Sequence, residues 1–189
     1  MAVADGPVGG GPVLDVMDAV VLAGGSARRM GGVDKTALVV GGSPLLDRVL
    51  AALTDATAVV VVGPRRPVRD GARVTWVRED PPGGGPVAAL AAALPLVTAP
   101  LVALVAADLP FLSAATVGRL RAAVTPVTGA AVDGALLVDP GGRDQLLTGV
   151  WRTGALRAAI PAEPRGVALR TVLAGLRIAR LPADARAKA

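Results

Sequence analysis

The chain contains no cysteine and no histidine, and only three of its 189 residues are aromatic. Without cysteine and histidine, thiol nucleophiles, thiolate zinc sites, Ser-His triads and acid-base catalysis by imidazole are excluded. A bound metal ion would therefore have oxygen ligands, which suits magnesium, manganese or calcium. The few aromatic residues offer no stacking platform, and no run of basic residues is longer than two. We therefore expect no nucleic-acid partner.

Positive charges exceed negative charges by five, and nearly all of them are arginine, since Lys35 and Lys188 are the only lysines. Such an excess suits an anionic ligand, but an arginine-rich composition also produces it without any ligand, so both interpretations stay open. Hydrophobic residues make up 52% of the chain. That fraction and this length are ample for one self-supporting core.

The stretch 83–107 carries no charged residue and is long enough for a membrane-spanning helix. However, Pro86, Pro95 and Pro100 divide it, and residues 96–100 have the composition of a loop between a helix and a buried strand. We therefore expect no membrane span. The N-terminus also lacks the basic start and apolar core of a signal peptide, which favours the cytoplasm.

The composition along the chain predicts one domain with short appended ends. Residues 1–16 are rich in glycine and proline and show no periodicity, so we expect a mobile tail there. A single domain is expected over 17–182, followed by a frayed end at 183–189.

Apolar runs alternate with helical patterns throughout that domain. Strands are expected at 18–23, 58–62, 73–78, 101–106, 130–138, 146–151 and 177–181, and helices at 44–53, 86–94, 113–124, 153–160 and 167–176. The strand runs are apolar without alternation, which is typical of strands buried on both faces of a parallel sheet. The pattern predicts a three-layer α/β/α domain with a doubly wound, mostly parallel, Rossmann-like sheet. Ligands of such sheets bind beyond the carboxyl ends of the strands.

A glycine-rich loop follows the first expected strand and reads LAGGSARRMGGVDK over residues 22–35. Paired glycines let backbone N–H groups approach a phosphate, and Arg28, Arg29 and Lys35 add cations within the same segment. The pattern is neither GxxxxGK[ST] nor GxGxxG, so it is not the loop of a P-loop protein or of a dinucleotide-binding fold. A glycine pair by itself is more often an ordinary turn.

The whole segment resembles the signature LAGG-x-x-x-RMG-x-x-DK of the molybdenum cofactor nucleotidyltransferase family. Three later segments are similar to the family's other motifs, in the same order: RED at 78–80 with GGPVAAL at 84–90, ADLPFL at 107–112, and QLLTGVWR at 145–152. This resemblance covers about residues 19–180 and implies a fold of the nucleotide-diphospho-sugar transferase type. It also implies transfer of GMP from GTP to the phosphate of the molybdopterin cofactor, with release of pyrophosphate. The segment RMGGVDK favours the guanylyltransferases of the family, and a cytidylyltransferase acting on the same cofactor is the alternative.

The resemblance also implies the residues of the site. Nucleotide-binding residues are expected at Leu22, Ala23, Gly24, Gly25, Lys35, Asp80 and Asp108, and catalytic residues at Arg29, Lys35 and Asp108. Asp108 is the expected ligand of Mg²⁺, with Mn²⁺ as the alternative, because a carboxylate after an apolar strand is costly to bury without a cation or hydrogen bonds. A turn-stabilising role for Asp80 and a helix-capping role for Asp108 are the alternatives, although Ser113 is better placed to cap the helix.

Two features depart from the family's pattern. The second expected strand ends in Val62-Gly63-Pro64, where the family commonly offers an asparagine to the nucleotide, which leaves base selectivity open. No segment is similar to the family's closing motif, N-x-N-T-P-E-D or D-x-D-T-x-E-D, so weaker metal or pterin binding, or completion of the site by a partner, is expected. A nucleotide-binding relative without transfer, and a nucleotidyltransferase acting on a sugar or another small phosphate, are the remaining alternatives.

The family's precedent implies transient partners, namely a cofactor-delivery protein or a molybdoenzyme. The arginine-rich segment 165–180 has two interpretations: it binds the anionic pterin phosphate, or it is a solvated helix face.

Overall fold

The computed structural model describes residues 16–24, 39–40, 42–69, 71–125 and 131–183. Within these residues a seven-stranded sheet has the order β5-β4-β1-β6-β8-β7-β9. Its strands are β1 (Met17–Leu22), β4 (Ala56–Val62), β5 (Val74–Val77), β6 (Leu101–Ala106), β7 (Gly134–Val138), β8 (Asp144–Arg152) and β9 (Ile178–Pro182). β8 runs antiparallel to both of its neighbours, and the other neighbouring strands are parallel. The prediction of a mostly parallel sheet is therefore confirmed.

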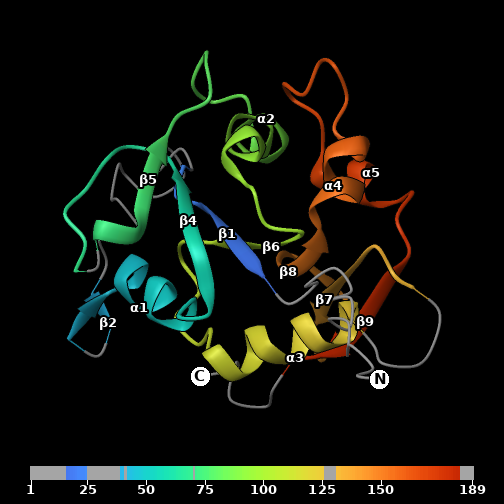
Figure 1. Ribbon diagram of the computed structural model, residues 1–189, viewed down its shortest axis with the longest axis horizontal. Coiled ribbons are helices and arrows are strands. Elements are labelled where there is room, and N and C mark those ends of the chain that lie inside the picture. Colours follow the sequence, from blue (N-terminus) through green and yellow to red (C-terminus); the bar gives the residue numbers. More distant parts are fainter. Residues whose placement is uncertain (1–15, 25–38, 41, 70, 126–130, 184–189) are drawn as a thin grey trace, which may run out of the picture.

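Five α-helices of the described residues cover the sheet on both faces. They are α1 (Leu45–Ala52), α2 (Pro86–Ala93), α3 (Ala114–Val124), α4 (Thr153–Ala159) and α5 (Leu169–Leu173). α1 and α3 pack against one face, and α2, α4 and α5 pack against the other (Figure 1). This arrangement is the expected three-layer α/β/α architecture.

The strands lack an alternation of apolar and polar residues because they are buried on both faces, as expected. Every residue of β1 is buried. Ala19 and Val21 contribute to the core under α1 and α3, whereas Val20 contributes to the core under α2. A strand that is covered on both faces must be apolar at both odd and even positions.

The uncharged stretch 83–107 is occupied by α2, a 3₁₀ turn (Leu94–Leu96) and β6. Among the described residues no helix has the length and apolar character needed to cross a membrane. Ser113 caps α3 as expected, because its Oγ accepts the N–H of Thr116 at 3.1 Å.

The observed elements differ from the expected ones mainly at their ends. α5 starts at Leu169 rather than at residue 167 because Ala168 has an extended backbone, with φ −75° and ψ 132°. A small antiparallel pair, β2 (Val39–Val40) with β3 (Ser43–Pro44), precedes α1 and had no signal in the sequence pattern. The expected tail and chain end lie outside the described residues except for Val16 and Ala183, so the domain limits stay a prediction.

Candidate active site

The centre of the sheet contains the point at which the order of the strands reverses. From β1 the chain moves outward to β4 and β5, and it then returns to the other side of β1 to form β6. The carboxyl ends of β1 and β6 lie side by side at this reversal, and open α/β sheets bind ligands in a crevice beyond the strand ends at such a point. The residues that follow these two strands, Ala23-Gly24 and Ala107-Asp108, are those that the sequence assigns to the site.

Hydrogen bonds hold these strand ends together. Leu22 and Ala106 are direct partners in the register of β1 and β6. One residue further on, the N–H of Ala107 donates to the carbonyl of Leu22 at 3.0 Å, and on the other side the N–H of Ala23 donates to the carbonyl of Val62 at 2.8 Å. The structure thus brings Leu22, Ala23 and Asp108 to one edge of the sheet.

Asp108 follows buried Ala107 and is itself exposed. The premise that this carboxylate is buried was wrong, because the chain turns outward immediately after β6. Leu109 and Leu112 pack against the core, and Nε of Arg48 donates to the carbonyl of Pro110 at 3.2 Å, so the loop is held on its inner side.

The carboxylate of Asp108 has no hydrogen bond or ion pair with any residue that the structure describes. It does not cap α3 either, since Ser113 does so. Mg²⁺ commonly uses one or two carboxylates and takes its remaining ligands from water and substrate phosphates. An exposed oxygen donor at a ligand-binding edge fits such an ion, and within the described ranges no cluster of three acidic, histidine or cysteine side chains forms a closed cage for one.

Asp80 lies just beyond the end of β5, and it is exposed. β4 separates β5 from β1, so Asp80 is at the same edge as Asp108 but at the far side of it. The neighbouring Glu79 stabilises the turn, because its Oε1 accepts the N–H of Gly83 at 3.0 Å. Glu79 supplies this hydrogen bond in the turn, and the role of Asp80 stays a prediction.

Three expected residues, Gly25, Arg29 and Lys35, lie outside the described residues. Their roles stay predictions. Of the expected nucleotide-binding set, the structure describes Leu22, Ala23, Gly24, Asp80 and Asp108.

The arginine-rich segment 165–180 divides into two groups in the structure. Arg177 donates side-chain hydrogen bonds to Asp133 at 3.2 and 3.0 Å, and Arg180 donates to Asp144 at 2.9 and 3.0 Å. The bonds from Arg177 lower the pKa of Asp133. These two arginines are therefore paired with carboxylates at the β7–β9 side of the sheet.

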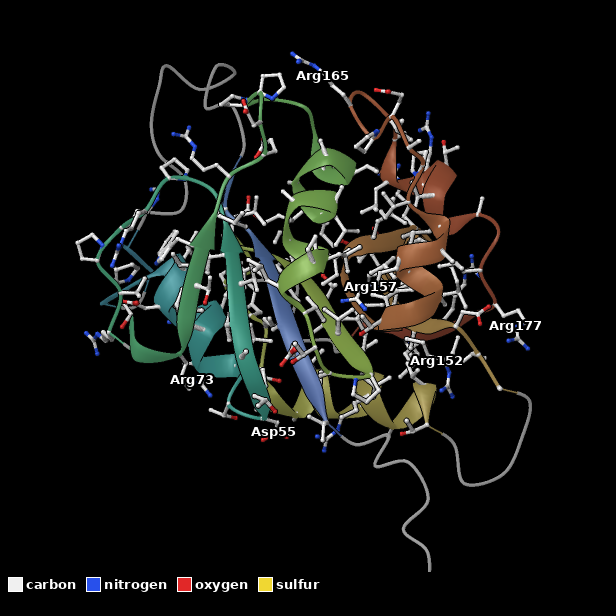
Figure 2. The ribbon with its side chains drawn as sticks, turned by 45° about the horizontal axis from the view of Figure 1, so that its top comes forward. Asp55, Arg73, Arg152, Arg157, Arg165 and Arg177 are labelled. Atoms are coloured by element: carbon white, nitrogen blue, oxygen red, sulfur yellow. The ribbon has the colours of Figure 1, made fainter. Side chains whose placement is uncertain are left out.

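Arg165 has a different position. It extends from the loop between α4 and α5 toward the loop between β5 and α2, at the opposite side of the molecule from Asp55 (Figure 2). The two loops are in contact, because the N–H of Gly166 donates to the carbonyl of Gly84 at 2.8 Å. Since Asp55 precedes β4, Arg165 lies toward the edge at which that strand ends.

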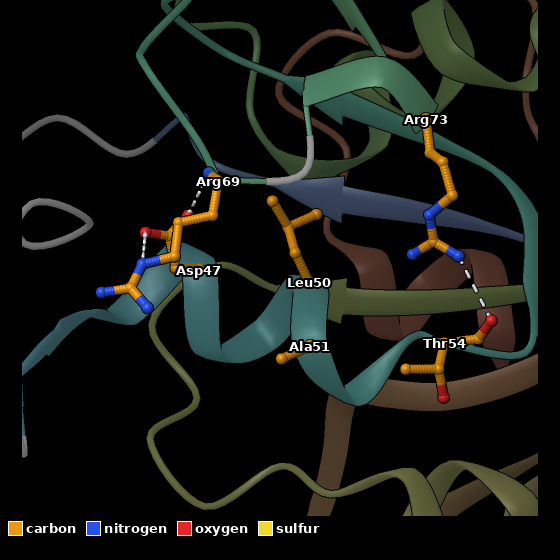
Figure 3. Close-up of a pocket in the computed structure, with 6 residues that line it drawn as sticks. All are labelled: Asp47, Leu50, Ala51, Thr54, Arg69 and Arg73. Carbon is orange, nitrogen blue, oxygen red and sulfur yellow. Dashed lines mark hydrogen bonds and ion pairs between the residues drawn. The ribbon is translucent and has the colours of Figure 1, made fainter.

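A hollow of about 420 Å³ is present elsewhere, lined by α1 with Thr54, Arg69 and Arg73 (Figure 3). Its polar groups already have partners within it. Asp47 accepts the N–H of Arg69 at 3.1 Å, and the guanidinium of Arg73 donates to the carbonyl of Thr54 at 3.2 Å. These polar groups therefore need no ligand to complete their hydrogen bonds.

In the sequence, Gly63 is notable only because the family's asparagine is absent from the end of this strand. In the structure Gly63 lies against the peptide bond between Ala23 and Gly24, and the Cβ of any side chain there would be 2.9 Å from the Ala23 carbonyl carbon. The available signal was a Gly-Pro pair directly after a buried strand.

Comparison with known proteins gives a consistent family. The model of the MobA-like NTP transferase domain matches residues 19–181. A protein of Natronomonas pharaonis named probable molybdenum cofactor guanylyltransferase is 38% identical over 100 residues, which cover 49% of this chain and 50% of that protein. One of the same name from Synechococcus elongatus is 41% identical over 115 residues, covering 54% and 56%. The chain thus matches about half the length of these curated relatives.

Solved structures share the fold. Molybdopterin-guanine dinucleotide biosynthesis protein A from Archaeoglobus fulgidus superposes with a TM-score of 0.61 at 21% identity, covering 87% of this chain and 83% of that one. The 2-C-methyl-D-erythritol 4-phosphate cytidylyltransferase of Thermus thermophilus gives a TM-score of 0.65 at 23% identity, with 91% of each chain covered. At these identities the likeness concerns the fold alone.

Proposed function

Since the chain belongs to the MobA-like NTP transferase domain family, we propose that it is a nucleotidyltransferase that moves GMP from GTP to the phosphate of molybdopterin and releases pyrophosphate. One observation carries the proposal: the Leu22–Gly24 backbone and exposed Asp108 lie at the ends of neighbouring strands where the strand order reverses. The names of the matched relatives support GTP as the nucleotide and the molybdenum cofactor as the acceptor.

The described residues supply position rather than a nucleophile. In transfer to a phosphate acceptor, the acceptor oxygen forms the new bond to the α-phosphorus of GTP while the bond to the pyrophosphate oxygen breaks. Such reactions depend on alignment and neutralisation of charge. The backbone of Leu22, Ala23 and Gly24 would hold the nucleotide in the crevice, and Asp80 would contact it from the end of β5.

The metal ion would be held by Asp108, with Mg²⁺ expected and Mn²⁺ as an alternative. When bound, this ion would neutralise charge on the phosphates. Asp108 suits this role because its carboxylate is exposed at the crevice and makes no hydrogen bond or ion pair to the described part of the chain.

Two cationic residues of the proposal belong to the glycine-rich segment 22–35. Gly25 would keep that backbone close to the phosphates, and Arg29 and Lys35 would neutralise the triphosphate. A cation about 4 Å from a phosphate oxygen contributes on the order of 4 kcal/mol at an effective dielectric constant of about 20. Arg165 would meet the anionic acceptor from the side of the α4–α5 loop. A cofactor-delivery protein or a molybdoenzyme would be the transient partner.

Calorimetry tests the nucleotide site directly. GTP, CTP and ATP are titrated with Mg²⁺ into wild-type protein, Asp108→Ala and Asp55→Ala. Asp55 is a matched control, because it is an exposed carboxylate at the opposite end of the strands (Figure 2). We expect GTP to bind best, at least tenfold more weakly to Asp108→Ala, and equally to Asp55→Ala. Preference for CTP would assign the base to cytosine, and no nucleotide binding by the wild type would overturn the proposal.

A further inference from the structure

At the proposed site, the end of β4 is hydrogen-bonded to the residue after β1 on one side and to β5 on the other. The carbonyl of Val62 accepts the N–H of Ala23 at 2.8 Å, and the N–H of Gly63 donates to the carbonyl of Val77 at 2.9 Å. These bonds tie the residue after β1 to β4 and tie β4 to β5. Gly63 is therefore fixed relative to the peptide bond between Ala23 and Gly24, where the glycine-rich loop begins.

No side chain fits at position 63 without displacing this peptide. The Cβ of a residue there would lie 2.9 Å from the carbonyl carbon of Ala23, 3.0 Å from its oxygen and 3.1 Å from the nitrogen of Gly24. Favourable separations between carbon atoms are about 3.5–4.0 Å. All three neighbours are backbone atoms, so none can rotate away, and one of the two strand ends would have to move by about half an ångström.

The backbone conformation points the same way. Gly63 has φ +151°, which residues with a side chain rarely adopt. Gly142 is a control for adding a methyl group to a glycine with positive φ, because its φ is +80° and it has open space around the position of a Cβ. Gly142 lies between β7 and β8, away from β1 and β4.

We propose that Gly63 is a positioning residue of the nucleotide site: by lacking a side chain it allows the Ala23–Gly24 peptide to lie against the end of β4 in its nucleotide-binding position. This inference rests on the proposed function, because it takes that peptide as part of the nucleotide site. Gly63 acts through the peptide and does not itself need to touch the nucleotide. A misplacement of one ångström can cost about a hundredfold in rate, and we expect the smaller shift here to weaken GTP binding about tenfold.

The contribution of Gly63 to nucleotide binding is tested by measuring GTP affinity in the presence of Mg²⁺. Gly63→Ala and Gly142→Ala are compared with the wild type by calorimetry, and thermal unfolding of each is measured in parallel. Both variants are expected to unfold at lower temperature, but only Gly63→Ala should bind GTP about tenfold more weakly. Affinities of the two variants within a factor of two of each other would show that Gly63 affects stability alone, and would overturn the inference.

The effect of a side chain at position 63 on the Ala23–Gly24 peptide is tested without nucleotide. Amide hydrogen exchange at Ala23 reports its bond to Val62, and Gly63→Ala should accelerate it about tenfold whereas Gly142→Ala should not. Unchanged exchange at Ala23 overturns the inference, while failure of wild-type protein to bind GTP overturns the proposed function instead.

If Gly63→Ala does not fold, NMR of the wild-type protein provides the test. Adding GTP with Mg²⁺ should shift the amide signals of Ala23, Gly24 and Gly63 but not that of Gly142. Binding without a shift at Gly63 overturns the inference.

Discussion

Asp18 is a buried carboxylate at the start of β1, at the opposite end of the strand from the proposed site. It is 1% exposed, and its oxygen atoms accept the N–H groups of Ala58, Thr98 and Ala99 at 3.1, 2.8 and 2.9 Å. Burial of a carboxylate is tolerated only with such partners. These bonds connect the start of β1 to β4 and to the segment before β6, so Asp18 fixes the central strands relative to one another.

Replacing Asp18 should therefore be costly although it is remote from the site. In Asp18→Asn an amide group replaces one oxygen, and at least one buried N–H loses its acceptor, so we expect unfolding to become easier by about 2–4 kcal/mol. Urea denaturation measures this change. Asp55→Asn is the control, because the one interaction of exposed Asp55 with the described part of the chain is a 3.8 Å ion pair with Arg121, and it should change stability by less than about 0.5 kcal/mol. Equal effects of the two substitutions would contradict the structural role of Asp18.

Individual residues of the site were only partly predictable from the sequence. Asp108 was placed correctly at a strand end, but its exposure was not, since apolar neighbours in the sequence do not show that the chain turns outward after β6. The role of Gly63 depends on β4 lying beside β1, and no local pattern contains that contact. Asp80 was predicted together with a competing role in the turn, where Glu79 supplies the hydrogen bond to Gly83.

At the level of elements, the pairing of β7 with β8 depends on glycines that accommodate a tryptophan. Trp151 is completely buried and is the direct partner of Gly134 across the two strands. A Cβ at Gly134 would collide with its ring, and one at Gly149 would lie 2.9 Å from its Nε1. The small residues thus provide the space that the largest side chain of the core occupies.

Adding a methyl group at Gly134, the cross-strand partner of Trp151, should be unfavourable. We expect Gly134→Ala to lower the free energy of unfolding by about 1–3 kcal/mol, because overpacking forces the ring or the strand to move. Gly118→Ala in α3 is the matched control, since a Cβ there meets nothing within 4 Å, and helix propensity should make it stabilising by roughly 0.5–1 kcal/mol. Denaturation curves that shift in the same direction for both variants would argue against this packing.

The outer edge of the sheet carries a pH-dependent contribution to stability. Hydrogen bonds from Arg177 lower the pKa of Asp133 in the folded chain. The stabilisation is therefore present above the ordinary aspartate pKa of about 4 and is lost as the pH falls through the lower, folded value.

Comparison of wild-type protein with Asp133→Asn detects this contribution. The wild type should be more stable than the variant at pH 7, and the difference should shrink as the solution is made acidic below about pH 4. Urea unfolding over a pH series measures both proteins under the same conditions. A difference that grows toward acid would show that the pKa of Asp133 is not lowered.

Element types followed from the sequence because apolar runs without alternation identify strands covered on both faces. Element ends did not, since the start of α5 depends on the extended backbone of Ala168. The antiparallel direction of β8 was also hidden, because a strand that is buried on both faces has the same pattern in either direction. The hairpin of β2 and β3 is too short to show a period.

For the whole molecule, the order of the strands determines where chemistry can occur. β1 and β6 lie beside each other where the strand order reverses, so the start of the glycine-rich loop and Asp108 follow the carboxyl ends of neighbouring strands. The alternation of strands and helices predicted this architecture, and the family match over residues 19–181 agrees with it. The loop cations lie outside the described residues, so their contribution has to be measured.

Release of pyrophosphate from GTP, with Mg²⁺ present and molybdopterin as acceptor, is the measurement that tests the proposed transfer most directly. We expect release that requires the acceptor, that falls by about a hundredfold or more in Asp108→Ala, equivalent to roughly 2.7 kcal/mol or more, and that is unchanged in Asp55→Ala. Release by Asp108→Ala at the wild-type rate would contradict the placement of the metal ion. Binding of GTP by the wild type without any release of pyrophosphate would contradict the transfer itself.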